Sequence, residues 1–245
     1  MKNPIYIGIS GQLSLARQLN TIAQNIANVN TPGFHGTAIK FETLLSPTAR
    51  NNNTQVNFVT AGKGYITREH GAFTQTGNAL DVAIDGNAYF ALQTPAGPVY
   101  TRDGRMNMTA EGDLLSVTGL PFLDDGGAPL QLNPALGAPV ISVDGAIYQN
   151  HTQVAKIGLF QIPSEGNLRY GPNASVVPDR PAVPAEGGTG QGVMQGYIES
   201  ANVNGVLEMT RLIEVSRAFE RMEAMLRQQE DMTLKSIQIF GGRRT

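Results

Sequence analysis

Three histidines, His35, His70 and His151, are the side chains of this 245-residue chain best suited to acid–base or metal chemistry. They lie far apart in the sequence, without an HExxH pattern or another spacing that would bring two imidazoles onto one metal ion. The chain has no cysteine, which excludes thiolate ligands, thiolate nucleophiles and disulfides. The sequence therefore predicts no metal site, and we expect the histidines to be single surface or loop residues.

Two groups of carboxylates could supply a general acid and a general base. Asp124 and Asp125 precede two glycines and are more simply a turn, whereas Asp81 and Asp85 fall on the polar face of a predicted strand. The glycine-rich GGTGQG at 187–192 lacks the dinucleotide-binding pattern, and no GxSxG elbow is present. We therefore expect no catalytic residue, no cofactor and no enzymatic activity; a hydrolase that uses an aspartate pair remains the alternative.

The overall charge and composition restrict the partners of the chain. Its formal net charge is −2, so no global positive field would attract nucleic acid. No run of about 18 apolar residues could span a bilayer, which predicts no membrane insertion. Polar residues interrupt the apolar residues at the N-terminus, so we expect no cleaved signal peptide. Only 16% of residues are charged, against roughly 25% in typical globular domains, which indicates contact with other protein.

The elements that position these residues begin with an amphipathic N-terminal helix. Its apolar stripe steps by four, three, four and three residues, which is the spacing of helices that pack against other helices; the stripe is Leu15, Leu19, Ile22, Ile26 and Val29. A group of asparagines then predicts a helix stop, because Asn tolerates the left-handed conformation that follows a last turn. Pro32 and Gly33 predict the centre of a type II turn. The residues we expect to form this corner are Asn25, Asn28, Asn30, Pro32, Gly33 and Phe34.

A second apolar stripe with the same spacing predicts a helix over residues 204–239, about 50 Å long at 1.5 Å per residue. The stripe consists of Leu212, Val215, Phe219, Met222 and Leu226. A helix of this length would overhang the shorter N-terminal helix. We therefore expect the remaining apolar residues, including Met225, Met232 and Ile237, to meet neighbouring copies in an assembly.

The middle of the chain has the period of two that is typical of strands. Alternation begins at residue 79 and continues in short runs to about residue 162, with Asp-Gly pairs at turns. Residues 46–65 indicate a linker or mobile loop, and residues 163–192, rich in Pro and Gly, lead out of the β domain. We predict an α+β multi-domain protein: terminal helices pack as a coiled-coil-like bundle, and the central all-β domain has short strands. The expected segments are 1–35 (helix and corner motif), 36–78 (linker), 79–192 (β domain) and 193–245 (C-terminal helix).

Three motifs resemble those of one family. NIANVNTPGF after the first helix is similar to the signature of the flagellar basal-body rod proteins. GNALDVAIDGNAYFAL and VYTRDGRMNM look like the start of that family's β domain, and GYIESANVNGVLEMTRLIEVSRAFERM looks like its C-terminal signature. The order of the motifs is also that of the family. Among rod proteins, the overall resemblance favours the proximal over the distal rod subunit.

The resemblance implies a structural subunit that passes unfolded through the flagellar type III export apparatus. It would assemble with proximal and distal rod subunits into the periplasmic rod, the drive shaft from motor to hook. The two apolar stripes would then carry assembly, and the corner motif would mark where the chain turns away from the inner helices. From another class, the alternative is a glycan-binding β module on an oligomerising helical stalk. That alternative predicts exposed aromatic residues, but the chain has no Trp and 7% aromatic residues.

Overall fold

The computed structural model describes residues 3–40, 43–45, 57–59, 62–185 and 192–241 of the chain. These residues form two compact units. One, which we call the helical unit, comprises Met1–Ala27, Thr37–Gly64 and Asn204–Thr245. The other, the β unit, comprises Asn28–Gly36 and Tyr65–Val203. Two helices and a central β-rich region confirm the predicted class in outline.

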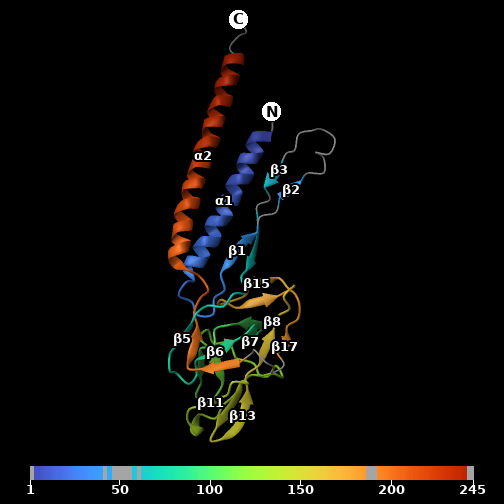
Figure 1. Ribbon diagram of the computed structural model, residues 1–245. Helices are drawn as coiled ribbons and strands as arrows, with labels where there is room; N and C mark the ends of the chain where they lie inside the picture. The colour runs from blue at the N-terminus through green and yellow to red at the C-terminus, as the bar shows by residue number, and fades with distance from the viewer. Residues whose placement is uncertain (1–2, 41–42, 46–56, 60–61, 186–191, 242–245) are drawn as a thin grey trace. The chain divides into compact units, whose positions relative to one another are not determined.

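The helical unit is built on α1 (Asn3–Ala27) and α2 (Gly205–Gly241), which lie side by side (Figure 1). They are antiparallel, because Gly8 in α1 faces Leu226 in α2 whereas Asn25 bonds to Glu208. Only residues 3–7 of α1 precede Gly8, but residues 227–241 of α2 follow Leu226. The expected overhang of α2 is therefore present, and α2 runs on past the start of α1 (Figure 1).

The local sequence accounts for the residue at which α2 begins and for the residue at which α1 ends. The side chain of Asn204 caps α2, since its Oδ1 accepts from the N–H groups of Val206 and Leu207, both at 3.1 Å. α1 ends at Ala27, so the expectation that Val29 continues its stripe was wrong; residues 28–30 form turns. α2 continues to Gly241, and the tail beyond it lies outside the described residues.

Short strands complete the helical unit and begin the β unit. β1 (Thr37–Lys40) and β4 (Lys63–Ile66) form a two-stranded sheet, as do β2 (Thr43–Leu45) and β3 (Asn57–Val59). The chain passes from the helical unit into the β unit within β4. Of the predicted linker at 46–65, residues 46–56 and 60–61 lie outside the described residues, and the rest includes β3 and most of β4.

The largest sheet of the β unit has six strands in the order β15-β16-β8-β7-β14-β17. Its strands are β7 (Ala88–Thr94), β8 (Gly97–Thr101), β14 (Leu159–Gln161), β15 (Leu168–Tyr170), β16 (Val176–Pro178) and β17 (Val183–Pro184). Three of these strands lie in the Pro- and Gly-rich segment that the sequence analysis assigned to an exit from the β domain. That assignment was wrong for the described part of 163–192.

The β unit also contains smaller sheets. β9 (Met106–Met108) pairs with β10 (Leu114–Ser116), and β11 (Val140–Ile141), β12 (Ala146–Gln149) and β13 (Thr152–Lys156) form a three-stranded sheet. β5 (Phe73–Gln75) pairs with β19 (Tyr197–Glu199), and β6 (Val82–Asp85) with β18 (Gly192–Gln195). Strands β18 and β19 thus occupy the start of the segment expected to be C-terminal helix. GGTGQG lies almost wholly outside the described residues.

Alternate residues of β7 enter two different apolar clusters. Ala88, Phe90 and Leu92 belong to the larger cluster, where the rings of Phe90 and Phe122 meet edge to face at 5.8 Å between centroids. Tyr89 and Ala91 belong to the smaller one on the opposite face of the strand. The predicted period of two therefore produces a β7 that is buried on both sides.

Candidate functional site

The two predicted apolar stripes meet in the helical unit. Ile22 is buried at 8% exposure, and the other stripe residues are half-buried. Glycines on α1 permit close packing: a Cβ on Gly8 would lie 2.5 Å from Cδ2 of Leu226, and one on Gly11 would lie 3.1 Å from Cε of Met222. Real Cβ contacts are longer, so both glycines make room for α2 side chains. Packing of α1 against α2 therefore covers one face of each helix.

A polar network closes the Ala27 end of this helix pair. Asn25 Nδ2 donates to the carbonyl of Thr37 at 3.0 Å, and the N–H of Thr37 donates to Asn25 Oδ1 at 2.9 Å. The same Nδ2 donates to Glu208 Oε2 at 3.3 Å, and Glu208, only 5% exposed, receives Arg211 on its other oxygen at 2.6 Å. The predicted corner residue Asn25 thus lies in the helical unit and links α1, β1 and α2.

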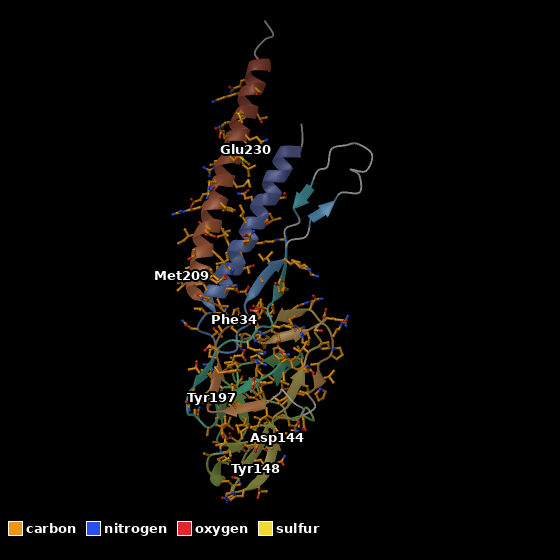
Figure 2. The ribbon with its side chains drawn as sticks, viewed as in Figure 1. Phe34, Asp144, Tyr148, Tyr197, Met209 and Glu230 are labelled. Carbon is orange, nitrogen blue, oxygen red and sulfur yellow. The ribbon has the colours of Figure 1, made fainter. Side chains whose placement is uncertain are left out.

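Both helices also carry apolar side chains that stay exposed. On α2, Met209 and Ile213 are 56% and 54% exposed, and Met209 is labelled in Figure 2. Among the helix side chains that the structure describes, the exposed large apolar ones are Ile9, Leu13, Val206, Leu207, Met209, Ile213, Met225, Met232 and Leu234. Met225 and Met232 were expected to remain exposed; the side chain of Ile237 lies outside the described residues.

The corner after α1 belongs to the β unit and has the predicted type II geometry. The N–H of Phe34 donates to the carbonyl of Thr31 at 3.2 Å, and Gly33 has φ of +69° at the third position of the turn. Gly33 donates its N–H to the carbonyl of Glu199 at 2.8 Å. A Cβ at Gly33 would overlap the backbone of Arg102 and Asp103, so only glycine fits here.

Phe34 and His35 anchor this corner in the β unit. Phe34 is 2% exposed, and its ring stacks on Tyr170 with 5.6 Å between centroids. Tyr170 also donates its hydroxyl to the carbonyl of His35 at 2.6 Å. Nδ1 of His35 lies 2.8 Å from the carbonyl of Thr67, so this nitrogen carries a proton and donates it to that oxygen. The corner is therefore held by packing and by hydrogen bonds on both sides of Phe34, which is labelled in Figure 2.

A buried ion pair lies next to the corner. Arg102 Nε donates to Glu199 Oε2 at 2.7 Å, and both side chains are 1% exposed. All five N–H groups of Arg102 find acceptors, and the acceptors are Glu199 Oε2, His70 Nδ1 and the carbonyls of Ile84, Gly86 and Ala88. The guanidinium thereby joins β19 to the chain around β6 and β7.

The environment of Glu199 favours its ionised form. Burial alone would raise the pKa of this carboxyl group, but His35, the charge of Arg102 and the N–H of Gly71 together lower the pKa below its ordinary value. Nε2 of His35 lies 3.6 Å from Glu199 Oε1 and is, in the part of the chain that the structure describes, the buried side-chain nitrogen without a hydrogen-bond partner.

Three family models match the chain. They are "Flagella basal body rod protein" over residues 5–35, "Flagellar hook protein FlgE/F/G D1 domain" over 83–168 and "Flagellar basal body rod FlgEFG protein C-terminal" over 194–239. The flagellar basal-body rod protein FlgF of Mesorhizobium japonicum is 45% identical over 99% of this chain and 100% of its own length. This chain belongs to the flagellar basal-body rod proteins.

Within this family, the likeness to FlgF is stronger than that to FlgG among the relatives compared. FlgF of Rhizobium meliloti is 43% identical over the full length of both chains. FlgG of Bacillus subtilis is 30% identical over 90% of this chain and 92% of its own. The resemblance of the motifs to rod proteins is thus confirmed, and this rod protein is of the FlgF type.

Several of the aspartates and histidines considered as catalytic candidates make hydrogen bonds within the fold. Asp124 caps its own turn, accepting from the N–H of Ala128 at 2.7 Å, and Asp81 accepts from Asn78. His70 bonds to Arg102, and His151 lies in the β12–β13 turn with φ of +62°. Among the described residues, no group of three or more His, Asp or Glu side chains is arranged to hold a metal ion, and no helix is long and apolar enough to cross a membrane.

Sequence reasoning missed the polar residues that fasten the corner. Arg102, Glu199 and Asn202 lie inside quoted family motifs, yet nothing in their spacing indicated that they meet the corner. The available signal was a charged residue directly after a short strand, as Arg102 in VYTR, or at its last position, as Glu199 in YIE. Such a charge, when buried, requires a partner. Whether the stripes and the corner carry assembly stays a prediction.

Proposed function

We propose that this rod protein is a structural subunit of the proximal rod and that it assembles with other rod subunits through α1 and α2. The observation that carries the proposal is the exposed apolar surface of α2. Relatives named FlgF over the full length of the chain support the placement in the basal body.

The exposed residues of α2 lie on more than one face. At 3.6 residues per turn, Met209 and Ile213 lie about a third of a turn to one side of the α1-facing stripe, and Val206 lies nearly opposite the stripe. Leu207, Met225 and Met232 lie about a third of a turn to the other side. α2 thus carries apolar side chains, interspersed with charged ones, on two sides besides the one that faces α1, and such side chains are stabilised by packing against further helices. One α1 covers only one of these sides, so neighbouring subunits supply the rest in a coiled-coil-like tube.

The energy of such packing suffices for a stable polymer. Fully burying one Leu, Ile or Met side chain contributes roughly 1.5–3 kcal/mol. Each subunit offers several such residues on two unpartnered faces of α2, together with Ile9 and Leu13 on α1. The β unit would then make lateral contacts around the helices.

The introduction of a charge at one exposed apolar residue tests this role. In a strain whose only copy carries Ile213→Glu, we expect loss of motility and basal bodies, seen by electron microscopy, that lack the outer rod and hook. Ile213→Val is the matched control and should assemble normally, because it keeps the apolar face. Since Ile213 is exposed in the single chain, the unfolding free energy of the purified variant should change by only about 0.5 kcal/mol or less. Normal flagella with Ile213→Glu would refute the assembly role.

The route to the rod is a second part of the proposal. The subunit passes through the flagellar type III export apparatus without removal of a signal peptide and works in the periplasm without a catalytic role. The absence of cysteine suits a chain that is exported unfolded and folds without disulfides. In a strain without the export apparatus, the subunit should stay in the cytoplasm with its N-terminus unprocessed. Its appearance in the periplasm of that strain would contradict this route.

A further inference from the structure

The β unit contains a pocket of about 430 Å³ beside β7, β14 and β17, the last three strands of the six-stranded sheet. Each of these strands lines it with one residue, namely Tyr89, Gln161 and Val183. All of the lining residues belong to the β unit. Sites for small ligands have volumes of about 300–1,000 Å³, so the pocket can hold a small organic molecule.

Tyr89 brings a buried hydrogen-bond donor to this pocket. Its side chain is 5% exposed, yet its hydroxyl has no hydrogen-bond partner among the residues that the structure describes. Burial raises the pKa of this hydroxyl, although the nearby charges of Arg102 and Arg68 act to lower the pKa, so the hydroxyl keeps its proton at neutral pH. A buried tyrosine hydroxyl usually has a partner. Because Tyr89 lines the pocket, a ligand there is the partner within reach.

Arg68 brings a positive charge to the same pocket. Its Nη1 donates to the carbonyl of Ile162 at 3.0 Å, and its Nη2 donates to the carbonyls of Pro163 and Gly166 at 2.9 Å and 2.7 Å. These bonds hold the guanidinium against the segment that forms one wall. In the described part of the chain, no carboxylate pairs with Arg68, and its Nε–H has no acceptor. The charge is therefore fixed in place and uncompensated.

The remaining groups around the pocket add no net charge. Arg102 also lines it, but its charge is matched by Glu199 at 2.7 Å. His70 is neutral in this arrangement: its Nδ1 accepts from Arg102 Nη2 at 2.7 Å, so its Nε2 carries the proton and donates to Asn87 Oδ1 at 3.2 Å. No Asp or Glu is among the described residues that line the pocket. The pocket thus carries one positive charge, that of Arg68.

The donors of the pocket suit a carboxylate. Asn87 uses its Oδ1 within the fold, whereas its Nδ2 has no partner among the described residues and adds to the free donors of Tyr89 and Arg68. An ionised carboxylate only accepts hydrogen bonds and carries one negative charge, which matches these groups. A phosphate dianion would bring a second charge without a partner. Ile162 and Val183 add apolar wall, which favours an organic acid over a bare ion.

We propose that this pocket binds the carboxylate of an organic monoanion between the Tyr89 hydroxyl and the Arg68 guanidinium, with the apolar part of the ligand against Ile162 and Val183. The carboxylate can be that of a free small acid or that of a peptide terminus, because the chemistry of recognition is the same. The site lies wholly within the β unit and does not depend on the proposed role of the helices in assembly.

Titration of the ¹⁵N-labelled full chain with sodium butyrate, followed by NMR, tests the site. Sodium chloride keeps the ionic strength constant, and butyramide, which has the same shape without the charge, is the control ligand. We expect saturable shifts of the backbone amides at 68–70, 87–89 and 161–162 with butyrate and none with butyramide. Absence of saturable shifts with butyrate, or equal shifts with butyramide, would overturn the proposal.

Two variants test the assigned donors and the charge count. Tyr89→Phe should weaken butyrate binding about tenfold while leaving the thermal midpoint unchanged, because the lost hydroxyl has no partner in the described fold. Tyr100→Phe is the matched control, since Tyr100 is a buried tyrosine of the adjacent β8 that does not line the pocket, and should bind as the parent does. Asn87→Asp keeps an acceptor for His70 but adds a negative charge, and should abolish saturable binding. Parent-like affinity in Tyr89→Phe or Asn87→Asp would refute the site.

Two further ligands define the occupant. N-acetyl-alanyl-alanine carries a free carboxylate at the end of a short peptide. Binding about tenfold or more tighter than that of butyrate would assign the site to a peptide terminus, and equal or weaker binding would assign it to a free acid; both results uphold a carboxylate site. Inorganic phosphate should bind more weakly than butyrate, and tighter binding of phosphate would contradict the assignment to a monoanion.

Discussion

Arg102 and Glu199 form an ion pair at 2.7 Å across 97 residues of sequence, with both side chains 1% exposed. The pair joins the residue after β8 to the last residue of β19, and the carbonyl of that same Glu199 holds Gly33 of the corner. A buried pair of this kind is strongly coupled to folding, because removal of one partner leaves the other charged and unpaired.

Replacement of Arg102 should therefore destabilise the β unit severely. We expect Arg102→Met to lower the free energy of unfolding by about 3–5 kcal/mol, measured by urea denaturation. The matched control is Arg180→Met, since Arg180 pairs with Glu165 at 3.0 Å with side chains 54% and 78% exposed. That change should cost less than about 1 kcal/mol. Equal losses in the two variants would show that the buried pair has no special weight.

The lowered pKa of Glu199 predicts the direction of a pH effect. Because the folded-state pKa lies below the unfolded-state value, the ionised carboxylate stabilises the protein fully above the unfolded-state pKa, about 4.3 for Glu. That stabilisation is lost as the pH falls through the folded-state pKa. The parent should thus exceed Glu199→Gln in unfolding free energy at neutral pH, and the difference should shrink in acid. A difference that grows below pH 4 would contradict the assignment.

Local signals in the sequence predicted both helices and several strands between residues 79 and 162. Apolar residues spaced three and four positions apart predicted α1 (from Leu15 to Ile26) and α2 (from Leu212 to Leu226), because helix packing imposes this regular repeat. The Pro32-Gly33 pair predicted the type II turn, because the third position of that turn has a positive φ and favours glycine. Features that depend on a few neighbouring residues can be inferred from one sequence.

Pairings between distant residues could not be inferred in this way. β15, β16 and β17 are two or three residues long, and β16 and β17 end in Pro178 and Pro184, so the sequence of this segment looks like loop. Glu199 looks like an ordinary surface carboxylate until the fold brings Arg102 to it. The unit that contains the corner was likewise hidden, because Gly33 meets residues far along the chain.

Gly33 can be tested against a glycine with the same backbone but open surroundings. Gly77 has φ of +73°, close to the +69° of Gly33, and a Cβ there would meet nothing within 4 Å. Gly33→Ala adds overlap with the backbone of Arg102 and Asp103 to the strain of a positive φ, whereas Gly77→Ala adds the strain alone.

We expect Gly77→Ala to cost about 1 kcal/mol and Gly33→Ala clearly more, in urea unfolding. The larger Gly33→Val should block rod assembly, and because Gly33 lies inside the β unit, that unit should itself be destabilised. Equal unfolding free energies for the two alanine variants would mean that the corner yields without cost.

A size exchange between Gly8 and Leu226 tests the close packing of α1 and α2. A Cβ on Gly8 already approaches Cδ2 of Leu226 to 2.5 Å, so Gly8→Leu should force the helices apart and reduce motility. Leu226→Ala alone leaves a gap and should weaken packing by about 2–5 kcal/mol if the site is fully buried in the rod. Together the two changes restore the total volume, so the double variant should swim better than either single one. Additive losses in motility would show that these residues do not face each other in the assembled rod.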